Sequence, residues 1–161
     1  MAVETSKPVA TKNVSRQPLQ FNSYDEILEY ARKLSQGPTR QLGNWSLGQI
    51  CRHLAVAMDS AIDGPTFKPA LWLRLLGPML KKRFLSRPMP SGFQLPKNGA
   101  SMIPAPTDDV VGLQLLEKAI RRLQQTSIRA PHGLFGKLTN QEWDQLQFRH
   151  SAMHLSFIEP A

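Results

Sequence analysis

Apolar residues recur at helical spacing in four segments of this chain. With about 100° of rotation per residue, positions i, i+3, i+4 and i+7 lie on one face of a helix. The spacing predicts helices over residues 23–36, 46–63, 108–126 and 139–157. No alternating pattern long enough for a strand accompanies them, and no segment repeats.

The first residues of these segments are typical of helix N-termini. Three segments open with a capping box, in which a Ser or Thr is followed three residues later by Glu or Gln: Ser23–Glu26, Ser46–Gln49 and Thr139–Glu142. The fourth opens with Asp108-Asp109, and negative charge is favourable at this end of the helix dipole. Gly-Pro pairs follow the first two segments.

A long connector, residues 64–107, separates the second and third predicted helices. Its first half predicts a short helix near residues 70–84, bent at Gly77-Pro78, and its second half is rich in proline. Four amphipathic helices with one long crossover predict an all-α protein, a four-helix bundle. We expect residues 1–20 to form a disordered tail and residues 21–161 to form one domain.

Composition restricts the class further. A single cysteine, Cys51, excludes an intrachain disulfide and lies on an apolar helical stripe, so we expect it in the core. No signal peptide and no segment of transmembrane length is recognisable, and a cytoplasmic location is expected.

The net charge of +8 is concentrated in the crossover, which holds no acidic residue. Its basic residues are Lys68, Arg74, Lys81, Lys82, Arg83, Arg87 and Lys97. They form either a solvated connector or a rim that attracts an anionic metabolite, a membrane surface or nucleic acid. Nucleic acid is disfavoured, because neither zinc-finger spacing nor an RNA-binding strand motif is present. The apolar residues around Trp72, Leu76 and Leu80 form either a homodimer contact or a cover for the end of the bundle.

Two histidines, His150 and His154, lie four residues apart on the apolar face of the last predicted helix, together with Trp143, Leu146, Met153 and Phe157. Unpaired polar groups are expensive to bury, so two imidazoles on a core stripe suggest a ligand. This spacing puts two nitrogens on adjacent turns, where they can chelate one metal ion, although such pairs also arise by chance.

A third histidine, His53, lies at the edge of the stripe of the second predicted helix. Three convergent histidines with a vacant position would form a metal site of the catalytic type. Neutral imidazoles suit divalent zinc, nickel, copper or iron, and zinc or nickel is the expected cofactor. The fourth histidine, His132, lies in a turn-rich loop. Three roles stay open for it: a neighbour of the metal ligands, a substrate contact, or a loop residue without a functional role. The sequence lacks both the H-E-x-x-H motif of zinc proteases and the paired carboxylates of di-iron bundles.

Two stretches carry a family likeness. The segment Asn44-Trp45-Ser-Leu-Gly-Gln49-Ile-Cys-Arg-His53-Leu resembles the W-s-x-x-[eq]-x-x-x-H-l signature of the DinB/YfiT-like superfamily. The ending, from Phe135-Gly136-Lys-Leu-Thr139 to His150-x-x-x-His154-Leu, resembles it as well, in particular a bacterial branch without an assigned reaction.

The resemblance implies a bundle that holds a divalent metal through His53, His150 and His154. Members of the superfamily include metal-dependent transferases of low-molecular-weight thiols and a thiol-dependent isomerase. Many relatives have His-His at the end of the motif, and Met153 replaces the first of that pair here, so a polar neighbour of the metal is lost. Trp45, His132 and Met153 are the candidate residues around the ligands.

Two functions stay open from the sequence. The first is a metal-dependent transferase or hydrolase of a small molecule, with no catalytic residue beyond the metal centre, which activates a thiol or water. The second is a non-catalytic bundle, stabilised by metal or sensing a ligand, that acts through a partner protein.

Overall fold

The computed structural model describes residues 9–66, 68–92 and 102–161. Its elements are a 3-10 turn Thr11–Asn13, α1 Tyr24–Ser35, β1 Thr39–Gln41, α2 Leu47–Asp63, α3 Leu71–Ser86, α4 Asp109–Gln125, α5 Asn140–Leu155 and β2 Ile158–Pro160. The expected mainly helical class is confirmed, and α1, α2, α4 and α5 correspond to the four predicted segments.

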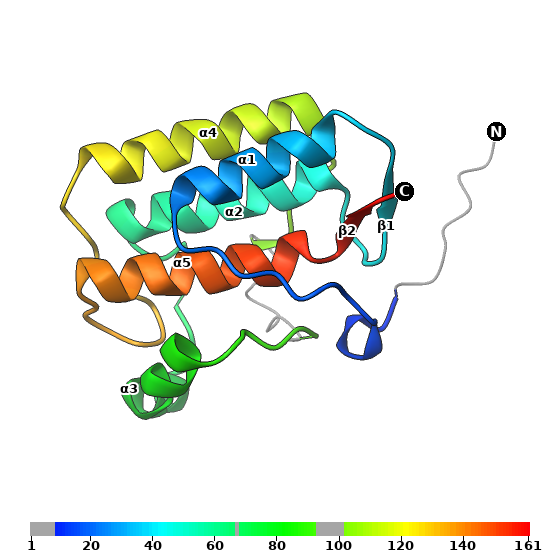
Figure 1. Cartoon of the computed structure of the whole chain (residues 1–161). Coiled ribbons are helices and arrows are strands. Elements are labelled where there is room, and N and C mark those ends of the chain that lie inside the picture. The colour runs from blue at the N-terminus through cyan, green and yellow to red at the C-terminus, as the bar shows by residue number, and fades with distance from the viewer. Residues whose placement is uncertain (1–8, 67, 93–101) are drawn as a thin grey trace.

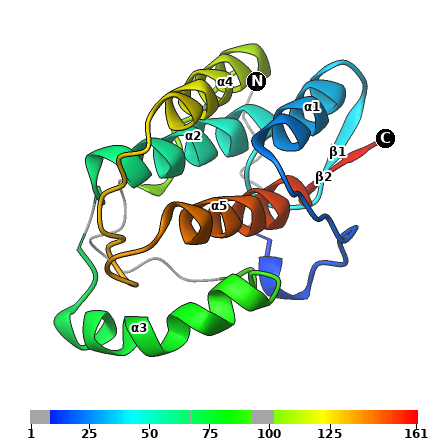
Figure 2. The ribbon, with the colours of Figure 1, turned by 60° about the vertical axis from the view of Figure 1, so that its left-hand side comes forward.

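The four helices α1, α2, α4 and α5 enclose the core, and α3 lies outside them (Figure 1). Helix α5 lies between α2 and α3 and contacts both (Figure 2). Fully buried side chains of α1, α2, α4 and α5 meet in the centre, among them Ile27, Leu54, Met58, Leu116 and Leu155. Cys51 is also fully buried in this core, as expected.

Two glycines bring α2 and α4 into backbone contact. A Cβ atom on Gly112 would lie 2.4 Å from the carbonyl oxygen of Gly48, so no larger side chain fits without movement. The backbone N–H of Gly48 also donates to Asp109 Oδ1 at 2.7 Å. The start of α4, and with it the end of the crossover, is therefore held against the start of α2.

The predicted helix starts are correct, and two of the three capping boxes form completely, at Ser46 and Thr139. In the third, Ser23 Oγ accepts from the N–H of Glu26, but the Glu26 carboxylate accepts from the N–H of Asn22, one residue before the cap. The last helix ends at Leu155 rather than Phe157, because the chain turns there to enter β2.

The two strands were not predicted from the sequence. β1 and β2 pair antiparallel, with Thr39 opposite Pro160 and Gln41 opposite Ile158. Arg40 and Glu159 form an ion pair across this ladder. Each strand has only three residues, too few to show the alternation by which a strand is recognised.

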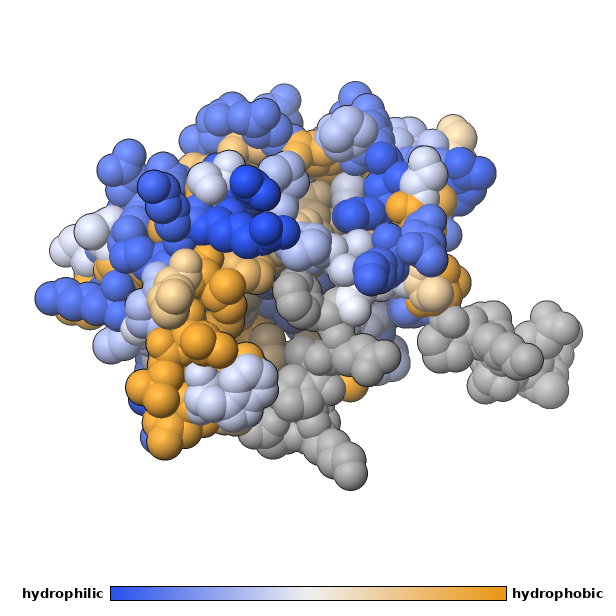
Figure 3. All heavy atoms as spheres, turned by 90° about the horizontal axis from the view of Figure 1, so that it is seen from below, coloured by the Kyte–Doolittle hydropathy of each residue, from blue (hydrophilic) through white to orange (hydrophobic). Residues whose placement is uncertain are grey.

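Helix α3 continues through Gly77 and Pro78 and is barely buried. Its one buried residue is Gly77, whose missing side chain leaves room for the carbonyl of Leu134. Lys81 joins it to α5 through Glu142, at 2.8 Å. The exposed aliphatic side chains of α3 lie in the orange area at the lower left of Figure 3; they are Leu71, Leu75, Leu76, Met79 and Leu80. Trp72 is exposed on the same helix. A homodimer contact through this face stays a prediction.

The expected tail, residues 1–20, is described only from Val9 onward, and its first eight residues lie outside the described part. From Val14 the chain runs along α5 to α1, and Arg16 bonds to Ser156 at 2.7 Å. Among the described helices, none has the length and apolar character needed to cross a membrane.

Candidate metal centre

The three histidines singled out in the sequence meet between α2 and α5. His53 extends from α2, and His150 and His154 extend from successive turns of α5. One ring nitrogen of each lies within 4.8 Å of the other two. The spacing on α5 was visible in the sequence, and the packing of α2 against α5 supplies the third imidazole.

The hydrogen bonds of His53 fix the proton on its ring. Its Nδ1 lies 3.0 Å from the carbonyl oxygen of Met102, which can only accept, so Nδ1 carries the hydrogen. The neutral ring then has its lone pair on Nε2, and this atom lies 3.3 Å from Nε2 of His150. A ligating histidine typically donates its other N–H to a carbonyl in this way.

The nitrogen separation suits a shared ion. Two nitrogens bound to one tetrahedral zinc ion, each at about 2.0–2.1 Å, lie roughly 3.3 Å apart. The 3.3 Å between His53 and His150 matches this value. The residues present therefore fit a divalent metal ion held by three imidazoles.

Trp45, just before α2, packs against two of the three rings. Its ring lies nearly parallel to that of His154, at 14° and with 5.3 Å between centroids. It also contacts His53, at 4.9 Å. Trp45 therefore restricts the orientation of both imidazoles and keeps water from that side of the cluster.

Burial keeps the three imidazoles neutral. Removal from water, together with the nearby His53 and His132, lowers the pKa of His150 to about 3, and burial is the largest cause. The pKa of His154 falls well below its usual value because of burial, and that of His53 is also lowered. Neutral imidazoles have the free lone pairs that metal binding requires.

The structure places His132 beside this cluster, not in it. Its Nδ1 accepts the backbone N–H groups of Leu134 and Phe135, both at 3.1 Å, and its ring stacks on Phe135. Burial lowers the pKa of His132 to about 4. These contacts make His132 a stabilising residue of its own loop, close enough to His150 to affect that residue's pKa.

Met153 points away from the other candidates. Its side chain lines a cavity on another face of α5, and its carbonyl oxygen accepts from Arg16 at 3.1 Å. The buried stripe of α5 instead includes Gln147 and Ser151, which the sequence reasoning did not single out. They share a face with His150 and His154 at helical spacing, and this was the signal available in the sequence.

Gln147 and Ser151 make the interior beside the cluster polar. The Gln147 amide donates to the carbonyl of Ala57 on α2 at 3.1 Å, one turn after His53. Its Oε1 atom and the Ser151 hydroxyl are buried without a partner among the described residues. Such groups normally bind water or a ligand, so this side of α5 is suited to more than apolar packing.

Searches among curated proteins and among solved structures gave no significant match. A family profile described as "Protein of unknown function (DUF1569)" matches residues 13–161, nearly the whole chain. This family is commonly placed in the DinB/YfiT-like clan, which agrees with the resemblance found in the sequence. The three-histidine cluster and its supporting contacts all lie inside the matched range, and the chain belongs to the DUF1569 family.

Proposed function

We propose that this protein binds one divalent metal ion, zinc or nickel, through His53, His150 and His154. The convergence of three ring nitrogens within 4.8 Å is the observation that carries the proposal. The fixed tautomer of His53 and the depressed imidazole pKa values support it, because they leave lone pairs free inside the cluster.

We further propose that the site acts on a small molecule, by thiol transfer or hydrolysis. A divalent ion with three protein ligands keeps positions open and lowers the pKa of a water or thiol bound there. The protein's own contribution is to hold the imidazoles neutral and oriented, through the Met102 carbonyl and the Trp45 ring. The DinB/YfiT-like resemblance favours a thiol as the substrate.

A non-catalytic role is the second candidate. Among the described residues, no carboxylate joins the histidine group, so no Asp or Glu stands among the ligands as a general base. Under this alternative, the metal links α2 to α5 and stabilises the bundle for a partner protein.

Metal content tests the first step. Protein purified without added metal, then loaded with zinc or nickel and desalted, is measured by elemental analysis. We expect about one ion per chain, and a content near zero in His150→Ala, because three ligands are needed for tight binding. His132→Gln is the matched control, since it removes the histidine outside the cluster. Equal metal content in wild type and His150→Ala would refute the site.

Turnover separates the two candidates. Loaded protein is tested with small thiols plus an electrophile, and with activated esters, in parallel with thermal unfolding before and after chelation. Turnover that His150→Ala abolishes supports the enzyme. Loss of thermal stability on chelation, with no turnover in either assay, supports the metal-stabilised bundle.

A further inference from the structure

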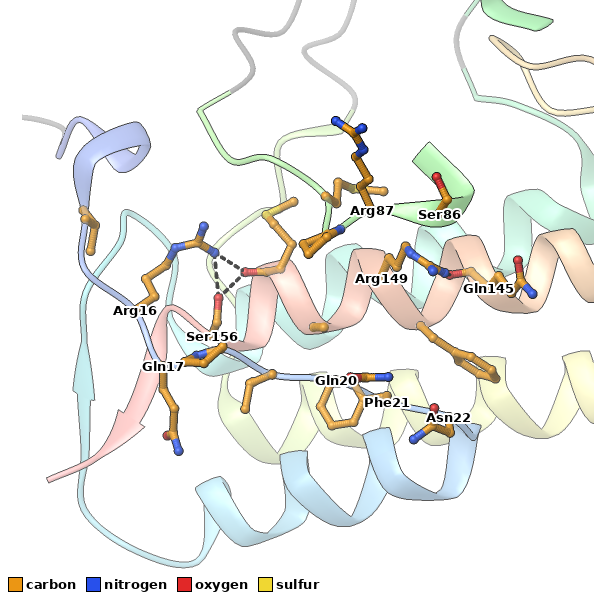
Figure 4. A pocket seen from close by; sticks show the side chains of 18 residues that line it. Arg16, Gln17, Gln20, Phe21, Asn22, Ser86, Arg87, Gln145, Arg149 and Ser156 are labelled. Atoms are coloured by element: carbon orange, nitrogen blue, oxygen red, sulfur yellow. Dashed lines mark hydrogen bonds between the residues drawn. The ribbon is translucent and has the colours of Figure 1, made fainter. Parts of the chain in front are cut away.

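A second site lies along α5, on a face away from the histidine cluster. It is a cavity of about 660 Å³ with α5 as its floor, and no histidine lines it. Residues 14–22 form one wall, and residues 86–89, at the end of α3, form the other (Figure 4). Its volume lies in the range of small-molecule sites.

The charged side chains that line this cavity are all positive. Among the described residues, its lining includes Arg16, Arg87 and Arg149 but no Asp or Glu. In the part of the chain that the structure describes, none of these arginines forms an ion pair. Such a lining favours a ligand with negative charge.

Arg16 is held in place and retains unused donors. Its Nη1 donates to the Met153 carbonyl at 3.1 Å and to Ser156 Oγ at 2.7 Å, and its Nη2 donates to Ser91 Oγ at 3.1 Å. The guanidinium also lies 4.4 Å from the centre of the Phe157 ring. Of its five N–H donors, Nε–H and one Nη2 hydrogen have no acceptor among the described residues. Partial burial lowers the pKa of Arg16, and a bound anion would compensate that loss of hydration.

Arg149 lies further along the same floor. Within residues 9–66, 68–92 and 102–161, its one hydrogen bond is a 3.3 Å contact with the Gln145 carbonyl of its own helix, so most of its donors have no acceptor there. Arg87 extends away from α5 at the opposite wall (Figure 4). Of the three lining arginines, Arg16 and Arg149 are therefore the two whose guanidinium groups lie near the floor.

Apolar side chains line the cavity between these arginines. Phe148 and Met153 contribute from α5, and Leu19 and Met89 contribute from the two walls. We propose that this cavity binds a small organic anion, a carboxylate or phosphate ester, with its charge on Arg16 and Arg149 and its apolar body against Phe148 and Met153. The proposal does not depend on the metal site.

Isothermal titration calorimetry with phenyl phosphate and phenylacetate tests it, with inorganic phosphate and benzyl alcohol as comparison ligands. We expect the aromatic anions to bind more tightly than either comparison ligand. Arg149→Gln and Arg16→Lys should each weaken binding about tenfold, since a hydrogen bond to a charged group contributes roughly that much. Arg74→Gln, an exposed arginine outside the cavity, is the charge-matched control.

Three results would overturn the proposal. The first is absence of binding by both aromatic anions at millimolar concentration. The second is affinities that are unchanged in Arg149→Gln and Arg16→Lys. The third is binding that requires added zinc and disappears in His150→Ala, because the anion would then be a ligand of the metal. Side-chain Nε–Hε NMR signals of the arginines, followed during the titration, locate the ligand independently of affinity. Failure of metal binding alone would leave these outcomes unaffected.

Discussion

Acid should destabilise the metal-free protein through its buried histidines, and His150 is the sharpest case. Burial lowers the pKa of His150 to about 3 in the folded chain, whereas a histidine in an unfolded chain titrates near 6.5. As the pH falls below 6.5, the histidine becomes protonated in the unfolded chain, whereas His150 stays neutral in the folded chain. The free energy of unfolding therefore decreases with falling pH.

The size of this effect follows from the two pKa values. Between pH 7.5 and pH 5.5 an unfolded histidine goes from roughly one-tenth to nine-tenths protonated, while His150 stays neutral, which lowers the free energy of unfolding by about 1.4 kcal/mol. The pKa values of His53, His132 and His154 are lowered as well, so their contributions have the same sign. The combined decrease is a substantial part of the unfolding free energy of a typical domain, which is about 5–15 kcal/mol.

Urea unfolding of chelator-treated protein at both pH values measures this decrease. His150→Gln is the comparison, because every other group is common to the two chains. We expect the decrease in unfolding free energy to be larger in the wild type by about 1.4 kcal/mol. Identical decreases would mean that His150 is protonated in the folded state, and the neutral cluster would then be wrong.

Substitutions at four further positions test the fold, each by urea unfolding. Gly112→Ala should destabilise by about 1–3 kcal/mol, although alanine is the better helix former, because its Cβ would meet the Gly48 carbonyl; no loss would show that the two backbones are not in contact. Ser46→Ala should lower the free energy of unfolding by about 0.5–2 kcal/mol, and Ser46→Asp should keep most of the wild-type stability, because aspartate can also cap the helix. Equal stability of Ser46→Ala and the wild type would show that this cap does not stabilise α2. Met58→Ala should cost about 2–5 kcal/mol, because this side chain is fully buried; a smaller loss would place it nearer the surface. Leu75→Ser, at a side chain 71% exposed, should change stability by less than about 0.5 kcal/mol; a larger loss would show that this face of α3 is covered in solution.

Local signals explain what the sequence predicted well. The helix starts follow from capping residues and apolar periodicity, which act within a few positions of each other. The same holds for His150 and His154, whose shared face depends only on helix geometry. That His53 faces them is consistent with the bundle expected from four amphipathic helices.

Features that depend on tertiary packing were not predicted. The Met102 carbonyl reaches His53 from the end of the crossover, close to where α4 is held against α2 by Gly48 and Gly112. The polar composition of residues 1–20 predicts a disordered tail, whereas in the described part of this segment Arg16 lies over the ring of Phe157. Only the folded chain brings such a segment to its partner, so spacing along the sequence contains no signal for it.

The short β1–β2 ladder has a consequence for the affinity of the metal centre. β2 begins three residues after the end of α5, which bears His150 and His154, and β1 precedes the segment that leads into α2 and His53. The β1–β2 pairing therefore limits how far the two ligand-bearing helices can slide past one another, because its register places Thr39 opposite Pro160 and Gln41 opposite Ile158. The chelating geometry is preorganised at a distance, by six residues of which none belongs to the histidine cluster.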